Sequence, residues 1–230
     1  MGTPAGGQWA PPAHDEADVD LAPTMTERDG TKEWRLNGTL HRTDGPAVEG
    51  TNGDKLWYQY GVLHRADGPA VERPHGTKEW YRHGELHRDD GPAIERADGA
   101  RQWRLHGKLH RTDGPAVEGA NGDKLWYQYG ELHRADSGPA AEYPDGAMLW
   151  YRHGELHRED GPAVERPGGA KEWRLHGKLH RTDGPAVERP NGTKEWWMNG
   201  ELHRDDGPAI ELVDGAGLWY QHGEPVPPGA

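Results

Sequence analysis

The chain has 230 residues, of which 34 are Gly and 19 are Pro, and hydrophobic residues make up only 32%, below the roughly 45–50% of ordinary globular domains. It contains no Phe but 11 Trp and 8 Tyr, which excludes both a large aliphatic core and simple disorder, because disordered chains are poor in aromatic residues. The net charge of −12 argues against nucleic acids and anionic membrane surfaces as partners, since both are bound through Lys and Arg.

Residues 1–28 contain no copy of any repeated motif and are rich in Pro, Gly, Ala and acidic residues, so we expect a flexible acidic leader. This segment lacks the basic start and the apolar stretch of about 7–15 residues that mark a secretory signal. No window of the chain approaches the roughly 20 apolar residues of a membrane-spanning helix. We therefore expect no membrane insertion and a cytoplasmic location. The absence of Cys excludes disulfides and thiolate chemistry.

A repeat of 23 residues fills residues 29–223, with about 8.5 copies of the pattern x-G-x-K-E-W-Y-x-x-G-x-L-H-R-x-D-G-P-A-V-E-x-x. The tripeptide Leu-His-Arg recurs every 23 residues, except for one interval of 24 that the insertion of Ser137 creates. Nine tryptophans follow the same period: Trp34, Trp57, Trp80, Trp103, Trp126, Trp150, Trp173, Trp196 and Trp219. Such a period predicts a repeat protein in which each short unit packs against its neighbours.

The tryptophan of each unit lies in a predicted strand. The residues before and after it vary together, because Glu33 accompanies Arg35 whereas Leu56 accompanies Tyr58. Positions two apart share one face of a strand but not of a helix, so this matching indicates a strand with the tryptophan on its opposite face. We expect the nine repeat tryptophans to be mostly buried as the structural core, and Trp9, which is outside the period, to be exposed.

Two kinds of turn join the predicted strands. Pairs such as Asn52-Gly53 are typical of type I′ hairpins, in which both central residues have positive φ, and they link each Ala-Val-Glu strand to the next Trp strand. The other junction is a longer loop, as over residues 86–92, where Arg88 and Asp90 are spaced to form an ion pair or a loop hydrogen bond. The sequence therefore predicts an all-β fold, an elongated single-layer antiparallel meander or solenoid of nine 23-residue β-hairpin repeats.

Residues 224–230 form a Pro-rich tail, in which Glu-Pro-Val-Pro-Pro stands where earlier units have the Leu-His-Arg motif. Proline has no N–H to donate to a neighbouring strand. We therefore expect this tail to cap the array by blunting the open edge of the sheet.

The pattern W-x-x-x-G-x-x-H, followed by Asp-Gly before the next aromatic strand, resembles the MORN repeat. The loop Leu-His-Arg-x-Asp-Gly-Pro-Ala is similar to a MORN-like subtype of bacterial, phage and giant-virus repeat proteins, and the resemblance covers about 85% of the chain. The family's usual W-x-x-G spacing is one residue longer here, as from Trp80 to Gly84. The resemblance implies an elongated single-layer sheet used for binding or scaffolding, without catalysis. Transfer of a lipid-binding role is disfavoured by these departures and by the negative charge.

Fifteen histidines raise the question of a metal site. Eight belong to the Leu-His-Arg motif: His41, His64, His87, His110, His133, His157, His180 and His203. Equivalent residues of neighbouring hairpins would lie roughly 2 × 4.8 Å apart, too far to share a zinc ion with ligands at about 2.0–2.3 Å. We therefore expect structural or solvent-facing histidines, no metal and no cofactor. We also expect these rings to be packed in the neutral form, because an Arg follows each; pairing with the Asp three residues later is the alternative.

The residues that differ between units are the candidate binding site. Apolar and aromatic side chains recur on the face opposite the tryptophans, where they would form an exposed surface typical of partner sites. They are Leu56, Tyr58, Tyr60, Leu125, Tyr127, Tyr129, Tyr151 and Tyr220. The alternative is that the tyrosine rings stack along the sheet and only cover its backbone.

These observations lead to two functional expectations. The first is a non-enzymatic repeat scaffold that binds a protein partner, or a second copy of itself, through the exposed aromatic sheet face. The alternative is carbohydrate or cell-surface binding through ladders of Trp and Tyr, which would require flat exposed rings. Catalysis is disfavoured, because every candidate catalytic group recurs in equivalent surroundings whereas enzymes build one site from unlike residues.

Overall fold

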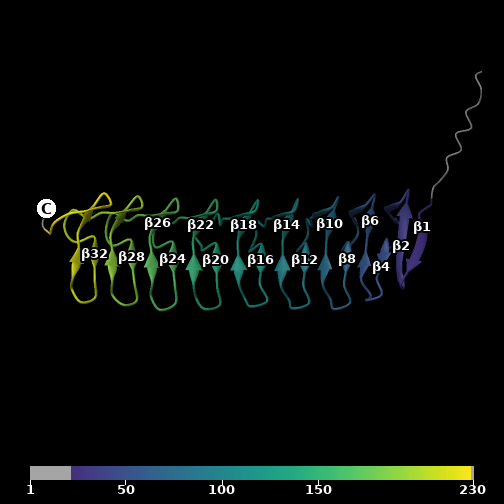
Figure 1. Ribbon diagram of the computed structural model, residues 1–230, viewed down its shortest axis with the longest axis horizontal. Coiled ribbons are helices and arrows are strands. Elements are labelled where there is room, and N and C mark those ends of the chain that lie inside the picture. The colour runs from purple at the N-terminus through teal and green to yellow at the C-terminus, as the bar shows by residue number, and fades with distance from the viewer. Residues whose placement is uncertain (1–21, 229–230) are drawn as a thin grey trace, which may run out of the picture.

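The computed structural model describes residues 22–228, and this part of the chain is an all-β rod without helices. Figure 1 shows one hairpin unit after another placed side by side along the rod. The predicted all-β repeat of about 23 residues, arranged as an antiparallel meander, is confirmed. Within these residues no helix is long and apolar enough to cross a membrane.

One long antiparallel sheet runs the length of the rod. Its strands are β1 (Thr24–Arg28), β2 (Thr31–Leu36), β3 (Thr39–Leu40), β4 (Val48–Glu49), β5 (Lys55–Leu56), β8 (Val71–Glu72), β9 (Lys78–Glu79), β12 (Ile94–Glu95), β13 (Arg101–Gln102), β16 (Val117–Glu118), β17 (Lys124–Leu125), β20 (Ala141–Glu142), β21 (Met148–Leu149), β24 (Val164–Glu165), β25 (Lys171–Glu172), β28 (Val187–Glu188), β29 (Lys194–Glu195), β32 (Ile210–Glu211) and β33 (Gly217–Leu218). Each unit contributes one Ala-Val-Glu strand and one strand that precedes its tryptophan.

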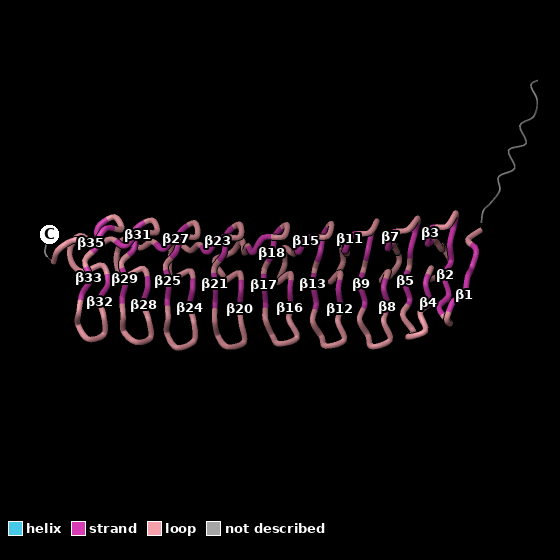
Figure 2. Tube along the Cα trace, viewed as in Figure 1, coloured by secondary structure: helices cyan, strands magenta, loops and turns pink. Residues whose placement is uncertain are grey.

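A row of short two-stranded hairpins follows one margin of this sheet (Figure 2). They are formed by β6 (Tyr58–Gln59) and β7 (Val62–Leu63), β10 (Tyr81–Arg82) and β11 (Glu85–Leu86), β14 (Arg104–Leu105) and β15 (Lys108–Leu109), β18 (Tyr127–Gln128) and β19 (Glu131–Leu132), β22 (Tyr151–Arg152) and β23 (Glu155–Leu156), β26 (Arg174–Leu175) and β27 (Lys178–Leu179), β30 (Trp197–Met198) and β31 (Glu201–Leu202), and β34 (Tyr220–Gln221) and β35 (Glu224–Pro225). A tryptophan separates each of these hairpins from its strand in the long sheet.

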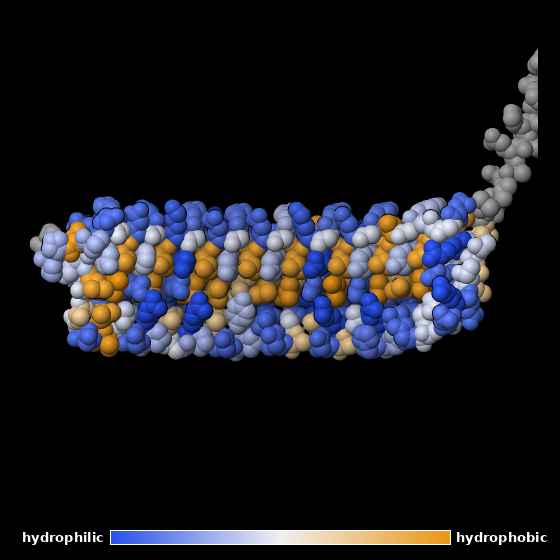
Figure 3. All heavy atoms as spheres, in the orientation of Figure 1, coloured by the Kyte–Doolittle hydropathy of each residue, from blue (hydrophilic) through white to orange (hydrophobic). Residues whose placement is uncertain are grey.

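The register of the long sheet gives its two faces different chemistry. On one face Val48 and Val71 flank Leu56, whereas on the other Glu49 is paired with Lys55. Because side chains alternate along a strand, the Val and Leu side chains share one face and the charged pair lies on the other. In other units a polar residue such as Glu79 or Glu172 takes the place of Leu56 between the Val and Ile side chains. Figure 3 shows apolar residues gathered in a band along the rod between two hydrophilic margins. Opposite charges on neighbouring strands contribute about 0.2–1 kcal/mol a pair.

The two-residue type I′ turns lie at the tips of the short hairpins, not at the predicted Asn-Gly pairs. At the tip between β10 and β11, His83 and Gly84 have φ of 53° and 83°. At the predicted site only Gly53 has positive φ. There the backbone closes a three-residue loop through hydrogen bonds from Gly53 N to Gly50 O and from Gly50 N to Asp54 O, both 2.9 Å. The prediction was wrong because this longer loop, a type I turn followed by a left-handed Gly, uses the same Gly.

The buried core consists mainly of alanines, with Val71, Ile94, Val164 and Val187 beside them, rather than of tryptophans. The Ala of every Asp-Gly-Pro-Ala segment has no exposed surface: Ala47, Ala70, Ala93, Ala116, Ala140, Ala163, Ala186 and Ala209. The carbonyl of this Ala accepts a hydrogen bond from the backbone N–H of the tryptophan in its own unit, as from Trp57 to Ala70 at 2.8 Å. A small side chain is favoured here because the loop backbone lies directly against the sheet.

The expectation that the repeat tryptophans are mostly buried is therefore wrong, because most of them are only partly buried. Only Trp150, at 9% exposure, is buried, and the other eight keep part of their surface in solvent. In seven of these eight, all but Trp219, an arginine guanidinium about 4 Å from the ring centroid covers one face of the ring. Trp9 lies outside the described residues.

The two ends of the array differ from the expected boundaries. Residues 24–28, assigned from the sequence to the leader, form strand β1, which pairs with β2 from Thr24 opposite Arg35 to Arg28 opposite Thr31. The remainder of the expected leader, residues 1–21, lies outside the described part of the chain. At the other end β35 pairs with β34. The start of the Pro-rich tail thus completes the last short hairpin.

Candidate functional site

The Leu-His-Arg-x-Asp-Gly-Pro-Ala loop holds its arginine over the tryptophan of the same unit. In the second unit the Arg65 guanidinium carbon lies 4.0 Å from the Trp57 ring centroid. Its Nε donates to Asp67 at 3.1 Å, and its Nη1 donates to the Pro69 carbonyl at 3.2 Å and to Glu72 at 2.9 Å. We call this arrangement the arginine clamp. It combines a cation–π contact with charge-assisted hydrogen bonds.

The glycine of the loop is required by this clamp. A Cβ on Gly68 would lie 3.0 Å from the Arg65 guanidinium carbon, so the guanidinium is sandwiched between backbone and indole. Equivalent clamps occupy the first eight units, with guanidinium-to-ring distances of 3.9–4.1 Å. Trp219 has Pro227 at the arginine position. The predicted Arg88–Asp90 contact is confirmed, with Nε and Oδ1 2.9 Å apart.

Each clamp presents one carboxylate to solvent. The Asp67 side chain is 84% exposed, and its pKa is lowered, first by the hydrogen bond from Arg65. The pKa values of the equivalent aspartates are lowered in the same direction: Asp44, Asp90, Asp113, Asp136, Asp160, Asp183 and Asp206. A row of ionised carboxylates therefore follows the loops along the rod.

The motif histidines join neighbouring units. His41 Nδ1 accepts the backbone N–H of Tyr60, 3.2 Å away at the tip of the next short hairpin, and the two ring centroids are 4.4 Å apart. An Nδ1 that accepts a hydrogen bond carries no hydrogen of its own, so this contact requires the imidazole hydrogen to lie on Nε2. The Nε2 of His87 contacts Asp89 at 3.0 Å, whereas Asp90, three residues after the histidine, pairs with arginine. These contacts support the neutral-ring interpretation.

The predicted aromatic face is divided into two parts. Tyr58, Tyr127, Tyr151 and Tyr220 lie on the first strands of short hairpins and are partly buried, as are Leu56 and Leu125 on the long sheet. By contrast Tyr60 and Tyr129 are 75% and 66% exposed. They lie at left-handed tip positions, against His41 and His110. The eight residues therefore do not form one continuous surface.

The residues on either side of a tryptophan were predicted to share one face of the strand, and where both are polar they contact each other. Arg35 donates to Glu33 at 2.8 Å, and the Tyr81 hydroxyl donates to Glu79 at 3.0 Å. Burial, and secondly the Glu79 charge, raises the pKa of Tyr81 to about 12. Where leucine replaces the acidic partner, as at Leu125, the tyrosine has no such acceptor.

The fifth and sixth units form an apolar aromatic surface that we call the tyrosine cluster: Leu125, Tyr127, Tyr143, Leu149 and Tyr151. Leu125 and Leu149 flank Ala141 on neighbouring strands. Burial, and then the neighbouring phenols of Tyr143 and Tyr151, raises the pKa of Tyr127, and burial followed by Tyr143 raises the pKa of Tyr151. Among the described residues, none of the three hydroxyls has a hydrogen-bond partner, and none is buried.

Sequence reasoning missed Tyr143, which is 37% exposed. It stands where the next unit has Arg166, beside Glu172 at 3.8 Å, and Leu149 stands at the position of Glu172. One polar pair of the repeat is thus replaced by Tyr and Leu. Comparison of this register position between units would have found it, since Tyr143 is the only aromatic residue there.

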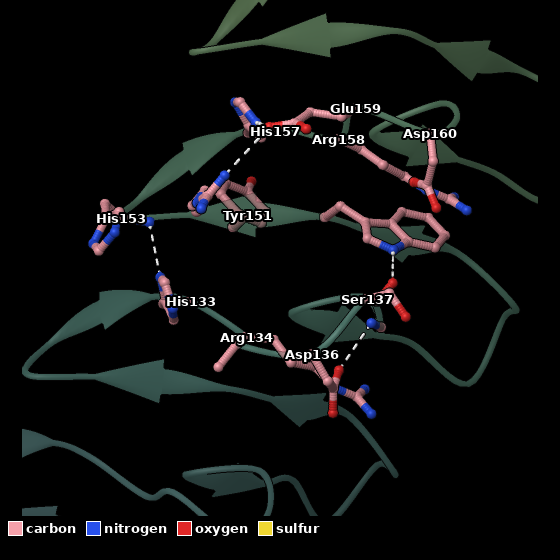
Figure 4. Close-up of a pocket in the computed structure, with 14 residues that line it drawn as sticks. His133, Arg134, Asp136, Ser137, Tyr151, His153, His157, Arg158, Glu159 and Asp160 are labelled. Carbon is pink, nitrogen blue, oxygen red and sulfur yellow. Dashed lines mark hydrogen bonds and ion pairs between the residues drawn. The ribbon is translucent and has the colours of Figure 1, made fainter.

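At four of the clamps a notch lies between the clamp and the loop of the preceding unit. Notches of about 410, 450 and 520 Å³ are lined by Trp57, Trp80 and Trp103 together with the loop aspartates. The notch at Trp150, about 600 Å³, includes the inserted Ser137 (Figure 4). There the Trp150 indole N–H donates to the Ser137 carbonyl at 3.0 Å.

The inserted residue also changes the clamp of its own unit. Arg134 Nε lies 2.7 Å from Asp136 Oδ1 but is not aligned for a hydrogen bond. Asp136 instead accepts the Gly138 N–H at 2.8 Å, the first cause of its lowered pKa.

The chain matches no protein-family model, and no curated protein matches its sequence.

Proposed function

We propose that this chain is a non-enzymatic, MORN-like repeat scaffold of the bacterial or phage type, and that it binds a protein partner or a second copy of itself through the tyrosine cluster. The cluster carries the proposal because it replaces a polar pair of the repeat with Tyr and Leu. Tyrosines that combine apolar area with an unpaired hydroxyl are enriched at protein interfaces. The clamp and core residues recur in nearly every unit, which supports a structural role for them.

Carbohydrate binding through a tryptophan ladder has less support. A sugar ring stacks on a flat aromatic face, but a guanidinium about 4 Å from the centroid covers one face of eight repeat tryptophans. The exposed rings of Tyr60 and Tyr129 are three units apart and packed against histidines.

The double variant Tyr143→Arg/Leu149→Glu tests the proposal. It gives positions 143 and 149 the residue types that the next unit has at the equivalent positions, Arg166 and Glu172. The fold is therefore expected to remain intact. Light scattering measures self-association, and a photo-cross-linker placed at Tyr143 captures a partner in the native host. We expect the double variant to abolish whichever association the original chain shows.

A control for the Leu149→Glu half is Leu56→Glu, which introduces the same negative charge at the equivalent position of a distant unit. Association is expected to survive this change. If the double variant and the control affect association equally, or if the cross-linker captures nothing and the chain is monomeric, the tyrosine cluster is not the binding surface.

A further inference from the structure

A second candidate surface lies on the tryptophan side of the sheet, apart from the tyrosine cluster. Three consecutive notches, at Trp57, Trp80 and Trp103, repeat the same walls of clamp, aspartate and indole. Each unit adds two strands to the long sheet, so neighbouring notches are about 2 × 4.8 Å apart, or roughly 9.6 Å.

The indole N–H groups in these three notches have no acceptor among the described residues, and they are not buried. The notch at Trp150 shows which kind of acceptor an indole N–H can have here, because the inserted Ser137 places a backbone carbonyl 3.0 Å from the indole nitrogen. In Figure 4 this carbonyl lies beside the indole, on the loop of the preceding unit. The other notches thus offer a donor to a carbonyl from outside the chain.

The charges exposed around these notches are mainly carboxylates. Asp44, Asp67, Asp90 and Asp113 have side chains that are 80–84% exposed, whereas the clamp arginines beside them are 20–22% exposed and already hydrogen bonded. Four of the 39 acidic residues and none of the 27 basic ones lie in residues 1–21, so the described residues keep a net charge of −8. An occupant with cationic side chains is complementary to this row.

The spacing between the notches indicates which backbone conformation a bound segment would have. A polyproline II helix has three residues per turn and a rise of about 3.1 Å, so equivalent residues recur every 9.3 Å or so. This agrees with the roughly 9.6 Å between notches. Aromatic grooves recognise such helices through their exposed carbonyls and ring faces.

We propose that the notches at Trp57, Trp80 and Trp103 bind a proline-containing basic segment of a partner protein in the polyproline II conformation. Carbonyl oxygens of the segment accept the indole N–H groups, and a Lys or Arg at every third residue meets the loop aspartates. This inference goes beyond the tyrosine cluster and does not depend on it.

The test uses the full chain and a twelve-residue peptide of repeated Pro-Pro-Lys triplets. In ¹H–¹⁵N spectra the peptide is expected to shift the indole signals of Trp57, Trp80 and Trp103 but not that of Trp150, whose N–H already has an acceptor. Trp80→Phe, which removes one donor, should weaken binding by about two- to tenfold. Trp150→Phe is the matched control and should leave affinity unchanged.

Charge and spacing are tested separately. Asp67→Asn keeps an oxygen to accept from Arg65 but removes the charge, and should weaken binding by about two- to fivefold. A peptide of the same composition with irregularly placed lysines, and one with Glu in place of Lys, should both bind more weakly. Equal binding of either peptide, or unchanged indole signals in the three notches, overturns the proposal. The double variant Tyr143→Arg/Leu149→Glu should bind the peptide as the original chain does. A failure of the tyrosine-cluster proposal can therefore be told apart from a failure of this one.

Discussion

The backbone N–H of His83 donates to Nδ1 of His64 across the boundary between two units, at 3.1 Å, with the ring centroids 4.6 Å apart. A protonated His64 would carry a hydrogen on this nitrogen and direct it at another donor. The contact therefore exists only for the neutral ring, and eight such contacts join the units along the rod.

This relationship predicts that the array loses stability in mild acid. Burial, then the neighbouring histidine and arginine, lowers the pKa of His64 and of His133 below the usual 6.5. The unfolded chain then binds more protons than the folded one as pH falls below about 6.5, so the free energy of unfolding decreases on acidification. Thermal unfolding at constant ionic strength between pH 8 and pH 5 should show a falling Tm.

The double variant His64→Asn/His133→Asn provides the control for this prediction. Asn has a side-chain oxygen that can accept the same backbone N–H and does not titrate, so the dependence of Tm on pH should become shallower. A Tm that rises on acidification would contradict the neutral-ring interpretation and indicate pairing of histidine with carboxylate.

Gly68→Ala should disturb the clamp of the second unit. The added methyl group would lie 3.0 Å from the Arg65 guanidinium carbon and would displace it from Trp57. We expect a loss of about 1–3 kcal/mol, as for overpacking elsewhere, measured by denaturant unfolding. In the background of Arg65→Ala the same change should cost much less, since contacting residues couple. Equal costs in both backgrounds would show that the clamp does not explain this Gly.

Ala93→Val should be more damaging than its small size suggests. Ala93 has no exposed surface, and enlarging it pushes the loop away from the sheet, at about 1–3 kcal/mol. Ala97→Val, at an exposed position four residues later, should change stability by less than about 0.5 kcal/mol. Similar effects at the two positions in urea unfolding would argue against an alanine core.

Deletion of residues 1–28 should destabilise the array more than deletion of residues 1–21. The longer deletion removes β1 and leaves β2 without the neighbour that pairs with it from Arg28 to Thr24. Tm values of the two truncated chains test this directly. If they agree, β1 adds nothing to the stability of the first unit.

Much of the unit could be predicted from the sequence, because its signals are local. The shared face of Glu33 and Arg35 follows from the period of two along a strand, and the contact between Arg88 and Asp90 follows from the same spacing. Both are observed at hydrogen-bonding distance. Because the unit is repeated, each of these patterns can be seen at several equivalent positions in the sequence.

The errors came from features that depend on how units meet. Tryptophan was expected in the core because it is large and periodic, but the loop backbone brings Ala70 to that place and leaves Trp57 to be covered by Arg65. The Asn52-Gly53 turn was misassigned because two loop lengths share that pair. Strand β1 was missed because it contains no copy of the motif, and pairing with β2 needs none.

The direction of the inter-strand hydrogen bonds has a mechanical consequence. Strands of the long sheet run across the rod, so the hydrogen bonds between them point along its axis, and each strand after β2 has only two residues. Tension applied at the two ends would load these short ladders one after another, as in a zipper. Each unit that detaches frees about 23 residues, or roughly 70 Å of extended chain once the thickness of the unit is deducted. The rod would thus lengthen in equal steps, one for each repeat that detaches.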